Sequence, residues 1–147
     1  MPVTRLALAA VLCLATLPAL ADTPRVTLRI TFDPAAAKAL ADMGEMVTVS
    51  SHFYGFPKAG ATMKPDEMGM ITLGIEDITI HPADATLETG GLLLSAPLDQ
   101  VEEPLVNVNV YSARFANEDN LLDCNLLPEE SLAKMTGPQD ITCKLLP

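Results

Sequence analysis

The stretch that decides the fold class is Arg25-Val26-Thr27-Leu28-Arg29-Ile30-Thr31-Phe32-Asp33. Apolar and polar side chains alternate through it without a fault, which is the period of a β-strand with one buried face. The residues expected to face the core are Val26, Leu28, Ile30 and Phe32. The stretch therefore predicts a strand that covers a hydrophobic core on one side only.

A short helix is expected directly after this strand. Asp33 is a favourable N-cap, Pro34 suits the first helical position, and Gly44 follows an alanine-rich run as a typical helix end. We expect the helix to end at Met43. Its packing stripe is expected to comprise Ala35, Ala39, Leu40 and Met43.

Further strands are separated by glycine, proline and acidic residues typical of turns. In residues 46–54 the expected inner face comprises Val47, Val49, Ser51 and Phe53. The other expected strands cover 69–75, 78–80, 85–88, 92–94, 105–115 and the terminal stretch through Ile141, Cys143 and Leu145. We also expect a turn or bulge near Glu76-Asp77, exposed loops over 55–67 and 117–125, and a second short helix from Pro128 toward Gly137.

Short strands at this spacing predict a single antiparallel β-sandwich of about seven strands with two short helices over residues 22–147. After one strand, the segment Pro57-Lys58-Ala59-Gly60-Ala61 resembles a loop of transthyretin-type sandwiches. Immunoglobulin-like and transthyretin-like arrangements both stay open. No family resemblance extends across the whole chain.

Residues 1–21 have the pattern of a cleaved export signal. Arg5 precedes an apolar run from Leu6 to Leu17, and Ala19-Leu20-Ala21 supplies small residues for cleavage. The run is shorter than the roughly 20 residues that a membrane-spanning helix needs, so we expect no membrane span after cleavage. The sequence therefore predicts a periplasmic or secreted bacterial protein.

Charge narrows the range of partners. The 147 residues include 9 basic and 19 acidic side chains, and removal of the signal takes away only Arg5 among them, which leaves 8 against 19, a net charge of −11. Such an acidic body repels the phosphates of nucleic acids and of anionic membranes. A cationic protein or small ligand is the expected kind of partner.

Two cysteines, Cys124 and Cys143, remain after removal of the signal. An even number of cysteines in an exported protein predicts a disulfide. Zinc binding is the weaker interpretation, because neither cysteine has a second cysteine or a histidine at the spacing of a zinc site.

Signals for catalysis are weak, and a non-catalytic binding domain is the leading hypothesis. Only His52 and His81 could act as an imidazole base, and no Gly-x-Ser-x-Gly motif is present. The expected binding surfaces are the polar faces of two strands, together with the 55–67 loop and Arg114. Their residues are Ser50, His52, Tyr54, Asn107, Asn109 and Tyr111.

The alternative hypothesis is a periplasmic Cu(I)-binding protein. Imidazole and thioether groups are soft ligands that suit Cu(I). If Phe53 pairs with Ile71 across two strands, His52 lies across from Thr72, and Met70 is diagonal to His52. The candidate ligands are His52, Met63, Met68 and Met70. In the leading hypothesis no cofactor is expected, and the methionines fill gaps in a core that has few aromatic rings.

Overall fold

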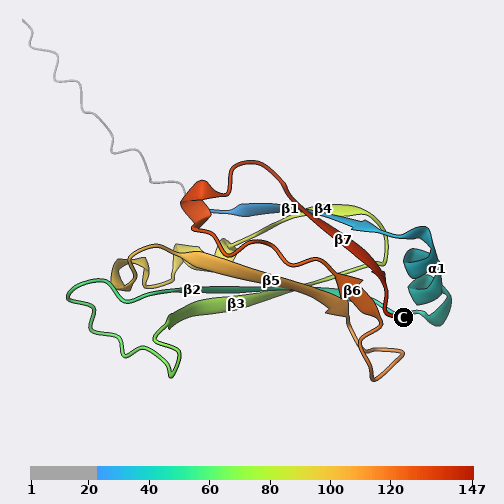
Figure 1. Cartoon of the computed structure of the whole chain (residues 1–147), viewed down its shortest axis with the longest axis horizontal. Helices are drawn as coiled ribbons and strands as arrows, with labels where there is room; N and C mark the ends of the chain where they lie inside the picture. Colours follow the sequence, from blue (N-terminus) through green and yellow to red (C-terminus); the bar gives the residue numbers. More distant parts are fainter. Residues whose placement is uncertain (1–22) are drawn as a thin grey trace, which may run out of the picture.

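Two facing β-sheets make up most of the computed structural model, which describes residues 23–147 (Figure 1). One sheet has the strand order β4-β1-β7-β6 and the other β3-β2-β5. The strands are β1 (Val26–Phe32), β2 (Val47–Gly55), β3 (Ile71–Ile80), β4 (Ala85–Thr89), β5 (Leu105–Ser112), β6 (Leu122–Cys124) and β7 (Gln139–Leu145). The helical elements are α1 (Pro34–Met43) and three 3₁₀ turns, η1 (Gly91–Leu94), η2 (Leu98–Gln100) and η3 (Leu132–Lys134).

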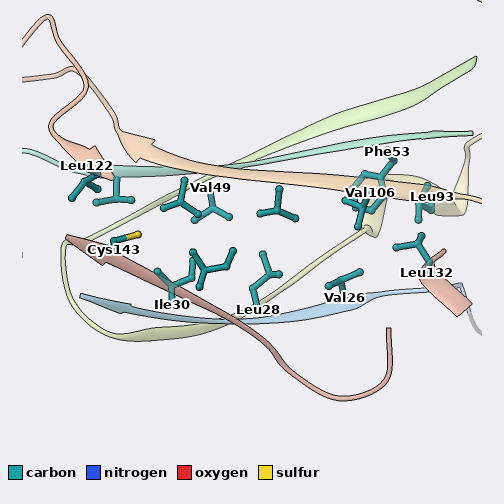
Figure 2. Close-up of a cluster of buried hydrophobic side chains, with 14 of the residues drawn as sticks. Val26, Leu28, Ile30, Val49, Phe53, Leu93, Val106, Leu122, Leu132 and Cys143 are labelled. Atoms are coloured by element: carbon teal, nitrogen blue, oxygen red, sulfur yellow. The ribbon is translucent and has the colours of Figure 1, made fainter. Parts of the chain in front are cut away.

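The hydrophobic core lies between the two sheets, as Figure 2 shows. Leu28 and Ile30 of β1 face Val49 and Phe53 of β2, and all four side chains are buried. Each fully buried side chain of this kind contributes about 1.5–3 kcal/mol relative to exposure. The inner faces predicted for β1 and β2 are therefore confirmed, and Val106 of β5 joins the same core.

Helix α1 begins and ends where the sequence predicted. The Asp33 carboxylate accepts a hydrogen bond from the Ala35 N–H at 2.8 Å, and Gly44 ends the helix in the left-handed conformation with φ 71°. The predicted packing stripe is partly wrong. Ala36 and Leu40, four residues apart on one side of the helix, are its buried residues, whereas Met43 is 43% exposed.

The prediction that all strands pair antiparallel is wrong for one pair of strands. Strand β1 pairs with β7 in parallel, with Ile30 opposite Ile141, while its other neighbour β4 is antiparallel. A parallel pair needs a long crossover connection, and nearly all of the domain lies between β1 and β7 in sequence. The result is one mixed sheet and one antiparallel sheet.

The two strands predicted over 69–75 and 78–80 form the single strand β3. Its irregularity is not near Glu76-Asp77 but where the register shifts between Phe53 and Tyr54 of β2. There Gly74 has φ 152°, and a Cβ on this glycine would lie 2.8 Å from the side chain of Leu92. The predicted register is therefore wrong, because Phe53 pairs with Gly74.

Two other predicted elements are replaced by 3₁₀ turns. Residues 92–94 belong to η1, because Gly90 turns the chain and the Glu76 carboxylate accepts the N–H groups of Gly90 and Leu92, both at 3.3 Å. The helix predicted from Pro128 is reduced to η3. Ser131 forms a bridge with Leu105, so this part of the chain joins the sheet instead of extending a helix.

The predicted disulfide between Cys124 and Cys143 is confirmed, with an S–S distance of 2.04 Å. The two residues are register partners in β6 and β7, so the end of the predicted 117–125 loop is a short strand. Cys143 is fully buried. The helical elements within residues 23–147 are not long and apolar enough to span a bilayer, and the expected signal over 1–21 lies outside the described residues.

Candidate functional site

The two predicted binding surfaces form one continuous surface, the outer face of the sheet β3-β2-β5. Ser50 pairs with Asn109 and His52 pairs with Asn107, and cross-strand partners lie on the same side of a sheet. By the same register Tyr111 lies beside Thr48 on this side. All six predicted residues therefore lie on the side of the sheet that faces away from the core.

One end of this face is hollowed into a pocket of about 380 Å³. Strand β2 supplies two of its side chains, the chain just after β2 a third, the chain just before β3 two more, and β5 and the segment after β6 one each. The lining residues are His52, Tyr54, Phe56, Met68, Met70, Asn107 and Glu129. We call this cavity the β2 pocket.

His52 is held in the β2 pocket by two neighbours. Its Nε2 atom lies 3.3 Å from the hydroxyl oxygen of Thr72, at hydrogen-bonding distance. Its ring centroid is 5.4 Å from that of Tyr54, with a tilt of 41° between the rings. Thr72 pairs with Tyr54 in the register, so the bulge in β3 brings this hydroxyl close to His52 although Ile75 is the cross-strand partner of His52.

Tyr54 and Glu129 join the pocket wall to a distant part of the chain. The Tyr54 hydroxyl donates a hydrogen bond to Oε1 of Glu129 at 2.5 Å, and Tyr54 is only 5% exposed. Burial, together with the bond to Glu129 and its negative charge, raises the pKa of Tyr54 to about 12. The tyrosine therefore stays neutral and keeps donating at physiological pH.

Met68 and Met70 enter the pocket from a tight turn. The Asp66 carboxylate oxygen Oδ1 accepts the N–H groups of both methionines, each at 2.9 Å. The Asp66 N–H donates to the Met70 carbonyl at 2.8 Å, and Gly69 between the methionines has φ 81°. One aspartate thus fixes the backbone of both methionines before β3 begins.

Of the four predicted metal ligands, the structure brings three together. His52, Met68 and Met70 line the β2 pocket, while Met63 does not, and its N–H donates to Gln100 at 3.1 Å. Phe56 and Glu129 were not predicted to belong to the site. Phe56 could have been found from the sequence, because it continues the two-residue spacing of His52 and Tyr54. No local pattern could indicate Glu129, because it lies 75 residues from its partner Tyr54.

The surroundings of the pocket are aromatic and acidic. Phe56 also lines an adjoining pocket of about 200 Å³ with Glu102, Glu103 and Leu105. The side chains that line the β2 pocket include a carboxylate and three aromatic rings, with no lysine or arginine among them. Within residues 23–147 there is no group of three or more histidine, cysteine, aspartate or glutamate side chains that could hold a metal ion.

A scan against protein-family models and searches of curated proteins and of solved structures find no match to this chain. The geometry of the outer face is therefore the basis for a functional proposal.

Proposed function

We propose that this protein is an exported, non-catalytic binding domain of the bacterial periplasm or secreted fraction, with an immunoglobulin-like or transthyretin-like sandwich fold. Its binding surface is the outer face of the sheet β3-β2-β5, and its partner is a cationic protein or ligand. One observation carries the proposal: the polar faces of β2 and β5 join into one surface that ends in the β2 pocket.

Export is supported by two features of the chain. The first 21 residues have the composition of a cleaved signal. The disulfide between Cys124 and Cys143 belongs to oxidising compartments such as the periplasm. Both features agree with a protein that acts outside the cytoplasm.

A cationic partner is supported by the chemistry of the β2 pocket. An ammonium or guanidinium group is attracted by aromatic faces and by a carboxylate, and Glu129 supplies the carboxylate. The aliphatic stem of lysine or arginine also buries well against apolar surface, which Phe56 and the 78% exposed Met68 provide. The net charge of −11 of residues 22–147 would steer such a partner toward the protein.

A non-catalytic role is supported by the environment of His52. A catalytic imidazole is usually oriented by a third group, most often a carboxylate. The hydrogen bond found for His52 among the described residues is the one to Thr72, and the Glu129 carboxylate bonds Tyr54 instead.

An arginine-rich peptide of eight residues tests the cationic partner. We expect Glu129→Gln to weaken its binding to the purified protein by about tenfold, because a hydrogen bond to a charged group contributes roughly 1.5–3 kcal/mol. Glu130→Gln is the matched control, since it removes the same charge one residue away and does not line the pocket. Fluorescence anisotropy measures both affinities.

Two results would contradict the proposal. Absence of peptide binding to the unmodified protein would contradict the proposal of a cationic partner. Equal losses in Glu129→Gln and Glu130→Gln would show attraction by bulk charge, without recognition in the pocket.

A further inference from the structure

We propose that His52, Met68 and Met70 form a binding site for Cu(I) in the β2 pocket. This rests on the proposed function only in using the same pocket of an exported binding domain. The observation behind it is that three soft ligands, which come from two separate segments of the chain, line one cavity that is open to solvent.

The ligand chemistry is selective for a soft ion. Thioether sulfur is a poor ligand for Mg²⁺ or Ca²⁺ but a good one for Cu(I), and an imidazole nitrogen completes a three-coordinate set. Neither cysteine within residues 23–147 competes for the ion, because Cys124 and Cys143 are joined to each other. The site therefore favours Cu(I), or its redox-inert analogue Ag(I), over hard divalent cations.

The turn before β3 prepares two of the ligands. Because Asp66 binds the N–H groups of both Met68 and Met70, the Cα atoms of the two residues are fixed relative to each other before any ion arrives. Only the side chains then need to become ordered, which lowers the entropy cost of binding. Asp66 thus acts as a positioning residue and not as a ligand.

Thr72 prepares the third ligand. Metal-binding histidines usually have one ring nitrogen in a hydrogen bond, which fixes the ring while the other nitrogen binds the ion. The Thr72 hydroxyl lies 3.3 Å from Nε2 of His52, so this partner is present, and the nearby Tyr54 ring limits the rotation of the imidazole. The ring is therefore oriented without a carboxylate.

Met63 is excluded from the site although it was a predicted ligand. Its backbone is tied to Gln100, and it does not line the β2 pocket. It is 40% exposed, so its thioether is accessible to a soft ion in solution. Met63 is therefore a matched control for Met68 and Met70, and His81, an exposed residue after β3, is a matched control for His52.

Anaerobic Cu(I) titration against a competing chelator tests the site. We expect one equivalent to bind with a dissociation constant below about 1 μM, and His52→Ala or the double variant Met68→Leu, Met70→Leu to weaken binding by at least about tenfold. Met63→Leu and His81→Ala should leave the affinity within about twofold. Methyl NMR with Ag(I) should shift the Met68 and Met70 signals and leave Met63 in place.

Two substitutions of Asp66 test its positioning role. Asparagine keeps an oxygen that can accept both N–H groups, so Asp66→Asn should retain most of the Cu(I) affinity. Asp66→Ala removes this acceptor and should lose the Cu(I) affinity with little change in thermal stability. Equal losses in the two variants would show that the charge of Asp66 matters and would overturn this role.

The metal proposal fails if the unmodified protein does not bind Cu(I) at micromolar concentration, or if Met63→Leu weakens binding as much as the double variant does. Both failures are distinguishable from failure of the proposed function. A protein that binds the arginine-rich peptide through Glu129 but does not bind Cu(I) keeps its binding surface and loses only this metal site.

Discussion

The two ends of β2 carry loops that are held in opposite ways. At the start of β2, beside α1, the buried Glu45 carboxylate accepts hydrogen bonds from the loop that follows β5, residues 113–117 (Figure 1). At the other end, the loop 56–70 is held largely by exposed side chains and forms part of the β2 pocket. The loop at the start of β2 is thus held by a buried charge, whereas the polar groups that hold the loop at the other end are exposed to solvent.

The Glu45 end is closed by four hydrogen bonds. Glu45 is 1% exposed, and its two carboxylate oxygens accept the N–H groups of Met46, Phe115, Ala116 and Asn117 at 2.9–3.1 Å. Burial alone would raise the pKa of Glu45, but the four donors together lower it below its usual range. This carboxylate therefore remains charged and acts as a structural clamp.

The pocket end has weaker restraints. The Gln100 side-chain oxygen accepts the N–H groups of Thr62 and Met63 at 2.8 and 3.1 Å, close to solvent. Exposed loops of this kind open at low cost and often form binding sites on a rigid scaffold. The two ends of the same strand therefore differ in how firmly their loops are held, and the less restrained end carries the β2 pocket that we propose as the binding site.

The largest effect is expected from removal of the disulfide, which joins β6 to β7 close to the start of α1, where the Asp33 N–H donates to the Cys143 carbonyl. Replacing both Cys124 and Cys143 by alanine should lower the free energy of unfolding by about 3 kcal/mol, because the chain without the cross-link gains loop entropy in the unfolded state. Urea denaturation measures this loss. Affinity of the β2 pocket for the arginine-rich peptide should change less than about twofold, since the disulfide lies at the other end.

A double variant as stable as the unmodified protein would show that the disulfide does not stabilise the fold. An equally large loss of peptide affinity would show that the two ends are coupled.

The next largest effect is expected at Glu45 itself. Glutamine has one carbonyl oxygen where glutamate has two acceptors, so Glu45→Gln leaves some of the four N–H groups unpaired and should cost about 2 kcal/mol. Denaturation at neutral pH measures this cost. Glu118→Gln, one residue further along the same loop, is an exposed control with the same charge change.

The cost of Glu45→Gln should depend on pH. Because the folded pKa of Glu45 is lowered, its stabilisation is fully present above the unfolded value of about 4.3 and is lost as the pH falls through the folded value. The difference in stability between the two proteins should therefore be constant above about pH 5 and shrink below about pH 4. A difference that stays constant to low pH would contradict the clamp.

Local patterns were enough to predict most of the strands and the main helix. Alternation identified β1, β2 and β5, and the capping residues Asp33 and Gly44 placed α1 correctly. Parallel pairing of β1 with β7 was missed because no local pattern reports which strand lies next to which. The bulge expected near Glu76-Asp77 was misplaced for a similar reason: it lies beside Gly74, and Leu92, which packs there, belongs to a later turn.

The candidate site was predicted in part for the same reason. His52, Met68 and Met70 were selected by residue type and closeness in sequence, and the structure brings them to one pocket although the assumed register was wrong. Glu129 and the clamp of Glu45 could not be predicted, because their partners lie 70 or more residues away. Long-range contacts of this kind depend on the finished fold.

The smallest effect is expected at Gln100, on the pocket end. Gln100→Ala removes the acceptor for Thr62 and Met63, but water can replace it at an exposed loop, so stability should fall by less than about 1 kcal/mol. Amide exchange at Thr62 and Met63 should nevertheless quicken several-fold, which mass spectrometry or NMR can follow. Peptide and Cu(I) affinities should stay within about twofold, because Asp66 holds the turn of Met68 and Met70 independently. A stability loss as large as that of Glu45→Gln would contradict the contrast between the two ends, since it would show that the exposed loop is clamped as firmly as the buried one.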